Sequence, residues 1–166
     1  MTNNKQLQLA LEIATMAHKN VQRRNGDPYI FHALRVANNS TYIRTKTQKA
    51  AGILHDVIED TPFDEEFLRQ QGIDEAILEI LRFLTHDKET ITYEDYIAHI
   101  CTNVDAMLVK LADLTDNLDQ GTLPVLTERD IERFKTYKTA QQTIMETLAK
   151  EHPSIFQEIL FHERFL

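Results

Sequence analysis

The chain has 166 residues, 42% of them hydrophobic, and a formal net charge of −8, which suits one folded domain and excludes a disordered chain. The negative charge argues against non-specific binding to nucleic acid or to an anionic membrane, so we expect neither as a partner. An anionic small molecule remains acceptable as a substrate if a metal ion and local cations offset the charge. A single cysteine, Cys101, forms no internal disulfide, and the first residues lack the apolar core of a signal peptide, so we expect a cytoplasmic location.

Glycine and proline number only four each, and no alternating β-branched run indicates a strand, so the sequence predicts an all-α fold. Hydrophobic spacing and capping residues predict helices over 4–20, 29–38, 45–58, 64–71, 74–84, 92–100, 103–118 (starting at 103 or 105) and 127–150, and after Pro153. Pro62 ends the third helix, Gly72 is a typical C-cap, and Gly121 and Pro124 break the chain again. Because no long linker divides the chain, residues 1–166 are expected to form a single helical bundle.

The third predicted helix carries an unusual group of polar residues within an apolar run. On an ideal helix His55, Asp56, Glu59 and Asp60 fall within roughly 140° of arc. One imidazole and three carboxylates suit a divalent metal with nitrogen and oxygen ligands, plus carboxylates left for proton transfer. The alternative is an ordinary solvated face, so a metal site requires further ligands from elsewhere in the chain.

Two other segments offer such ligands. His32 has mostly apolar neighbours, so we expect it to point inward or to lie at the edge of the core, either as a ligand or as a core histidine bonded to a carbonyl. Asp113 lies in an apolar stretch, where a carboxylate is costly to bury unless it is paired or metal-bound. Lys110, Asp113 and Asn117 fall within roughly 60° of arc, and the alternative for this group is an exposed salt bridge between Lys110 and Asp113.

A basic loop offers a phosphate-binding or purine-binding group. Arg23 and Arg24 are adjacent, and two guanidinium groups can hold a phosphate or stack on a base, although loop arginines are commonly only solvated. His86 and Asp87 form a second His–Asp pair at a predicted helix end, which we interpret as a polar turn. No nucleophile elbow, glycine-rich phosphate loop or paired-cysteine zinc motif is present in the sequence.

Three segments together resemble the HD superfamily of metal-dependent phosphohydrolases. They are 23–30 with His32, 54–61 around the His–Asp pair, and 109–113 with Asn117. Within the superfamily they are most similar to the hydrolase domain of the Rel/SpoT alarmone enzymes and their small stand-alone relatives. The resemblance covers about residues 17 to 119, with the three motifs in the family's order.

The resemblance implies an activity and a role for each matching residue. The reaction would remove pyrophosphate from the 3′ position of guanosine tetra- or pentaphosphate, a small-molecule nucleotide. One divalent ion, Mn²⁺, would be bound by His32, His55, Asp56 and Asp113. The pair that positions and activates water would be Glu59 and Asp60. The groups around the nucleotide would be Arg23, Arg24, Asn25 and Asn117, and Lys110 would add positive charge.

The chain departs from the family motif after Asp113. The family commonly reads Arg-Leu-His-Asn-Met-Arg-Thr there, whereas this chain reads 114–120 as Leu-Thr-Asp-Asn-Leu-Asp-Gln. Two basic residues are lost, and Asp116 and Asp119 lower the positive potential where a polyphosphate would lie. Two alternatives therefore stay open: an HD phosphohydrolase for another nucleotide or phosphoester, such as a nucleoside monophosphate, and a nucleotide-binding sensor without turnover. The sequence specifies no oligomeric state.

Overall fold

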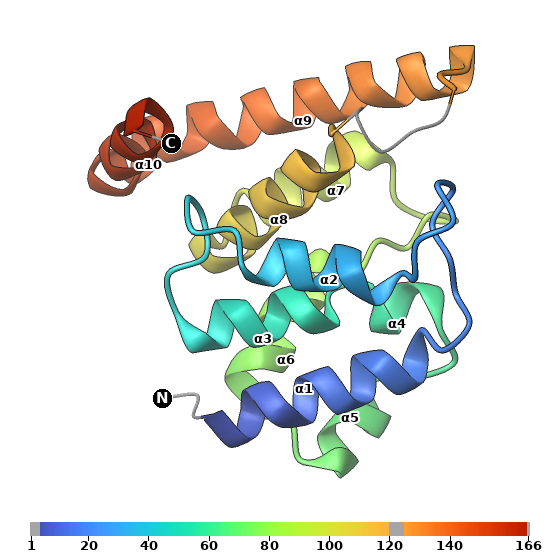
Figure 1. Cartoon of the computed structure of the whole chain (residues 1–166). Helices are drawn as coiled ribbons and strands as arrows, with labels where there is room; N and C mark the ends of the chain where they lie inside the picture. Colours follow the sequence, from blue (N-terminus) through green and yellow to red (C-terminus); the bar gives the residue numbers. More distant parts are fainter. Residues whose placement is uncertain (1–3, 120–124, 166) are drawn as a thin grey trace.

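The computed structural model describes residues 4–119 and 125–165, and most of these residues lie in helices joined by turns and loops (Figure 1). The predicted all-α fold is confirmed. The helices in chain order are α1 (Asn4–Ala17), α2 (Ile30–Ala37), α3 (Lys46–Leu54), α4 (Val57–Asp60), α5 (Glu65–Gln71), α6 (Glu75–Leu84), α7 (Tyr93–Ile100), α8 (Val104–Asn117), α9 (Glu128–Glu151) and α10 (Pro153–Phe165).

The helix boundaries follow the local signals in the sequence, with two exceptions. Gly72 caps α5 with a φ of 92°, the left-handed conformation that glycine adopts without strain. The first helix ends at Ala17, earlier than predicted, and Asn20 turns the chain with a φ of 66°. The third ends at Leu54, also earlier than predicted. The break predicted at Gly121 and Pro124 lies outside the described residues.

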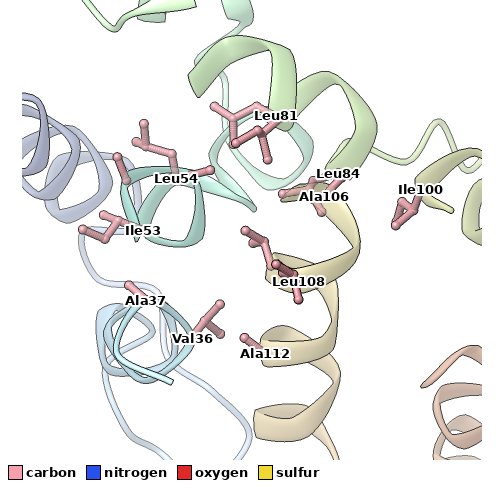
Figure 2. Close-up of a cluster of buried hydrophobic side chains, with 14 of the residues drawn as sticks. Val36, Ala37, Ile53, Leu54, Leu81, Leu84, Ile100, Ala106, Leu108 and Ala112 are labelled. Carbon is pink, nitrogen blue, oxygen red and sulfur yellow. The ribbon is translucent and has the colours of Figure 1, made fainter. Parts of the chain in front are cut away.

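The core is built around α3, which packs against α1, α2, α6 and α8. Figure 2 shows the side chains that meet there: Val36 and Ala37 from α2, Ile53 and Leu54 from α3, Leu81 and Leu84 from α6, and Ala106, Leu108 and Ala112 from α8. The long helix α9 packs on α7 and α8, and α10 packs on α9 (Figure 1). Within the described ranges, no helix has both the length and the apolar character needed to cross a membrane.

Gly52 allows α2 and α3 to approach closely. A Cβ atom at this position would lie 3.3 Å from the Cα of Ala37 and 3.5 Å from a side-chain methyl of Val36. The first of these neighbours is backbone and cannot swing away as a flexible side chain could. Since α2 carries His32 and α3 leads directly into His55, this close approach also sets the separation of the two histidines.

We expect Gly52→Ala to destabilise the fold by on the order of 1 kcal/mol, because crowding in a packed core costs about 1–3 kcal/mol and the gain in helix propensity is about 1 kcal/mol. The free energy of unfolding, measured by chemical denaturation, checks this expectation. A higher free energy of unfolding in Gly52→Ala would contradict this expectation. It would show that the gain in helix propensity outweighs the crowding and that α2 and α3 can separate without cost.

Candidate active site

The predicted helix over 45–58 is wrong in one respect, because it is interrupted at the His–Asp pair. The backbone of Asp56 leaves helical values, with φ −102° and ψ 0°, and α4 begins at Val57. The carbonyl of Gly52, which a continuous helix would pair with the amide of Asp56, accepts a hydrogen bond from His55 Nδ1 at 2.8 Å. His55 and Asp56 therefore lie at a bend, where His55 Nε2 is 3.0 Å from Asp56 Oδ2.

His32 and His55 both direct their Nε2 atoms toward Asp113. His32, on α2, is buried, and its Nδ1 lies 2.6 Å from Oδ2 of Asp116, just as His55 Nδ1 lies against the carbonyl of Gly52. Both partners are oxygen acceptors, so in the neutral rings the proton resides on Nδ1 and the lone pair on Nε2. Both Nε2 atoms face Asp113, whose Oδ1 is 3.3 Å from His32 and 3.5 Å from His55.

Asp113 is a buried carboxylate held by two side-chain donors. It is buried in α8, and it accepts hydrogen bonds from Lys110 Nζ at 2.8 Å and from Asn117 Nδ2 at 2.6 Å. Burial alone would raise the pKa of Asp113, but the Lys110 ammonium and the two imidazoles hold that pKa well below its usual value. The Lys110–Asp113 ion pair considered from the sequence is present but buried, and it belongs to the site.

The donor atoms fit a divalent cation. Nitrogen and carboxylate oxygen atoms of His32, His55 and Asp56 all lie within 4.8 Å of one another, and Asp113 adds a second carboxylate. Among the described residues, His55 Nε2 is a buried nitrogen without a hydrogen-bond partner, although Asp56 is close. Burial lowers the pKa of His55, but Asp56 and Asp113 outweigh it and raise that pKa, so the cluster attracts positive charge. Two imidazoles and two carboxylates suit manganese and similar divalent ions.

A second pair of carboxylates borders the cluster on α4. Glu59 accepts hydrogen bonds from the backbone amide of His86 at 3.1 Å and from Lys88 Nζ at 2.6 Å. Asp60 is half exposed and lies 4.0 Å from Lys88. Burial and the neighbouring carboxylate of Asp56 raise the pKa of Asp60. A carboxylate with a raised pKa at the edge of a metal cluster is suited to accepting a proton.

Arg23 reaches the cluster from the loop before α2. Its guanidinium donates to Asp116 at 2.7 Å and to the side-chain oxygen of Asn117 at 2.9 Å. Asp116 also accepts from Arg35 Nε at 2.5 Å. Burial alone would raise the pKa of Asp116, but the hydrogen bonds from His32 and Arg35 hold it well below its usual value, so the carboxylate is ionised.

Most of the residues described above, though not Asp116 or Arg35, line one cavity of about 400 Å³, a size typical of small-molecule sites. Nine of the eleven residues predicted for the site line it: Arg23, His32, His55, Asp56, Glu59, Asp60, Lys110, Asp113 and Asn117. Three tyrosines line the same cavity, Tyr93 and Tyr96 from α7 and Tyr137 from α9. The cavity therefore combines a metal-type cluster with a surface on which a base could stack.

Arg24 and Asn25, which the resemblance placed at the nucleotide, do not line the cavity. The guanidinium of Arg24 instead pairs with the buried carboxylate of Asp130 at the start of α9 and donates to the carbonyl of Val125 at 3.1 Å. The amide of Asn25 donates to Asp27 at 2.9 Å within the same turn. Their positions fit a role in fixing the loop and not a contact with a substrate.

Sequence reasoning missed the roles that several residues have in the site. Asp116 and Arg35 stand three residues after Asp113 and His32, a spacing that places each pair on one helix face and could have revealed them. His86 lies in the predicted polar turn but also stacks on Tyr96, at 4.5 Å between ring centroids, and lines the cavity. The three tyrosines had no signal, because aromatic residues at helical spacing normally indicate core packing.

Comparison with known proteins agrees with this geometry. The helical fold and the His–Asp cluster define an HD-type domain, and the model of the HD domain family matches residues 29–118, more than half of the chain. The chain belongs to this family. Membership implies a divalent-metal site, and the cluster of His32, His55 and Asp56 is placed to hold it.

Individual relatives extend the comparison. A guanosine-3′,5′-bis(diphosphate) 3′-pyrophosphohydrolase of Haemophilus influenzae is 33% identical over 116 residues, which are 64% of this chain and 17% of that protein. The bifunctional (p)ppGpp synthase/hydrolase SpoT of Escherichia coli K12 is 33% identical over 126 residues, which are 69% of this chain and 18% of that protein. The chain thus spans less than a fifth of these relatives.

A solved structure matches nearly the whole fold. It is described as "A metazoan ortholog of SpoT hydrolyzes ppGpp and plays a role in starvation responses", and it superposes with a TM-score of 0.72 at 22% sequence identity. The match covers 99% of this chain and 98% of that chain, so it includes α9 and α10 as well as the HD segment. At this identity the likeness establishes the fold.

Proposed function

We propose that the chain is a metal-dependent nucleotide phosphohydrolase that releases pyrophosphate from the 3′ position of guanosine 3′,5′-bis(diphosphate). The observation that carries the proposal is the convergence of two imidazole Nε2 atoms and two carboxylates at the wall of a 400 Å³ cavity that also holds Arg23 and Lys110. The names of the relatives, several of them pyrophosphohydrolases of this nucleotide, support the choice of substrate. Residues 1–166 would act as one domain in the cytoplasm.

The ligands of the proposed metal are His32, His55, Asp56 and Asp113, and the proposed ion is Mn²⁺, which accepts mixed nitrogen and oxygen donors. When bound, the ion would acidify a water molecule and offset phosphate charge. Glu59 and Asp60 lie beside this cluster, and they would orient the water and accept its proton. Lys88 pairs with Glu59 at 2.6 Å and lines the same cavity, so its ammonium would add positive charge for a substrate phosphate.

The charge of the cavity favours an anion only weakly. Its lining holds three cations (Arg23, Lys88 and Lys110) and four carboxylates (Asp56, Glu59, Asp60 and Asp113), so a divalent ion leaves a small positive surplus. Asp116, bonded to Arg23 at 2.7 Å, offsets that surplus. A polyphosphate would favour a strongly cationic site, and this cavity is only weakly cationic. The charge therefore favours a second candidate substrate with less charge, a nucleoside monophosphate.

Arg23→Ala should weaken nucleotide binding by about 10- to 100-fold, the range for a lost charge-assisted hydrogen bond, while the metal stays bound. The measurement is a nucleotide titration of the metal-loaded protein. Arg69→Ala is a matched control, because Arg69 pairs with Glu65 on the surface of α5, away from the cavity. Unchanged nucleotide affinity in the Arg23 variant would remove this residue from the substrate site.

A substrate panel tests the proposed reaction. Metal-loaded protein is incubated with guanosine tetraphosphate and, separately, with nucleoside monophosphates, and the release of pyrophosphate and of orthophosphate is measured. We expect pyrophosphate from the tetraphosphate. Orthophosphate from monophosphates alone would reject the 3′-pyrophosphohydrolase assignment in favour of the second candidate, and no turnover of any nucleotide would favour a binding protein.

A further inference from the structure

Asp116 is neither a proposed metal ligand nor a proposed substrate-binding residue. It lies one turn after Asp113 on α8, where the Rel/SpoT motif commonly has histidine, and its side chain is only 10% exposed. Its Oδ2 is 2.6 Å from His32 Nδ1, and the same carboxylate binds Arg23 at 2.7 Å and Arg35 at 2.5 Å. A largely buried carboxylate with three such partners has a defined orientation.

The contact with His32 determines which nitrogen of that ring is free. A carboxylate accepts, so it holds the proton on Nδ1 and leaves the Nε2 lone pair directed toward Asp113 at 3.3 Å and Asp56 at 3.9 Å. A carboxylate behind an imidazole also makes the ring a more basic metal ligand, as recurs in metal sites of proteins. His55 has the neutral carbonyl of Gly52 in the corresponding place, so only His32 gains a charged partner.

We propose that Asp116 is a positioning residue that orients His32 and strengthens it as a metal ligand. The proposal rests on the metal site of the proposed function. Asp116 would also couple this ligand to the substrate side of the cavity, because Arg23 is held jointly by Asp116 and by Asn117, and Asn117 in turn donates to Asp113 at 2.6 Å. In the alternative interpretation, Asp116 has only a structural role, in which its carboxylate forms ion pairs with Arg23 and Arg35.

Metal titrations of the purified protein separate these interpretations. Asp116→Ala should weaken Mn²⁺ binding by about 10- to 100-fold, the usual effect of removing such a partner. Asp116→Asn should weaken it less, because the amide oxygen still accepts from Nδ1 but carries no charge. Arg35→Met keeps the contact with His32 and removes only an ion pair of a half-exposed arginine, so binding should stay within about twofold of wild type. Equal losses in the Arg35 and Asp116 variants would support the structural interpretation and overturn the proposal.

The ring nitrogens of His32 give a readout that does not depend on the metal. In ¹⁵N spectra of the metal-free protein, neutral His32 should have its proton on Nδ1 in wild type and in Asp116→Asn, and should shift toward Nε2 in Asp116→Ala. Thermal unfolding identifies any variant that fails to fold, in which case Asp116→Asn carries the test. Unchanged His32 signals and wild-type Mn²⁺ affinity in Asp116→Ala would reject the proposal. A wild-type protein that binds no metal, with the predicted tautomer present, would instead reject the proposed function.

Discussion

Asp56→Ala and His55→Ala proteins are expected to lose tight metal binding and turnover together. Each substitution removes one of four proposed ligands. Because His55 Nε2 lies 3.0 Å from Asp56 Oδ2, each substitution also removes the neighbouring ligand atom of the other side chain. The remaining buried groups would then hold an incomplete ligand set, which binds divalent ions weakly. Calorimetric titration with Mn²⁺, together with an activity assay, measures both losses in the same preparation.

The second His–Asp pair of the chain supplies the matched control. Asp87 follows His86 in a turn, where its carboxylate accepts from the Thr90 hydroxyl at 2.5 Å, and it does not line the cavity. Asp87→Ala should therefore bind metal and turn over substrate like the wild type. Full manganese occupancy with turnover in Asp56→Ala would contradict the ligand assignment.

Glu59→Gln should retain the metal and lower kcat by roughly 10²- to 10⁴-fold, the range expected when general acid–base catalysis is lost. Glutamine keeps the shape of the side chain and can still accept from the amide of His86, but it cannot take a proton from water. Metal content and single-turnover rates of the same sample separate a chemical defect from a binding defect.

Glu79→Gln, on the exposed face of α6 outside the cavity lining, makes the same chemical change as a control and should leave kcat unchanged. If Glu59→Gln kept the wild-type rate, Glu59 would be only the partner of Lys88 on a solvated surface. Asp60, with its raised pKa, would then be the remaining proton acceptor on α4.

Most of the fold followed from local signals in the sequence. Gly72, the capping threonines Thr92 and Thr127, and the scarcity of glycine and proline predicted both the all-α class and most helix boundaries. The break before Val57 could not be predicted, because it depends on a side-chain hydrogen bond from His55 to the carbonyl of Gly52 that competes with the helix ladder.

Site residues that belong to a family motif could be predicted from the sequence. Contacts that depend on how the helices pack against one another could not. His32, His55, Asp56 and Asp113 come from three separate segments, and the family motifs indicated them before the structure brought them together. Asp116 was interpreted from its charge alone, as an acid that weakens phosphate binding, whereas its contacts with His32 and Arg23 require knowing how α2 lies against α8. The same limit applies to Arg24, whose partner Asp130 is more than a hundred residues away in the sequence.

Anomalous diffraction from crystals grown with Mn²⁺ tests the central claim most directly. Data collected at the manganese absorption edge locate the ion without reference to activity or to any substrate. We expect one strong peak in direct bonding contact with Nε2 of His32, Nε2 of His55 and the carboxylates of Asp56 and Asp113. A peak bound by other residues, or no peak between these four side chains at saturating Mn²⁺, would contradict the proposed metal centre.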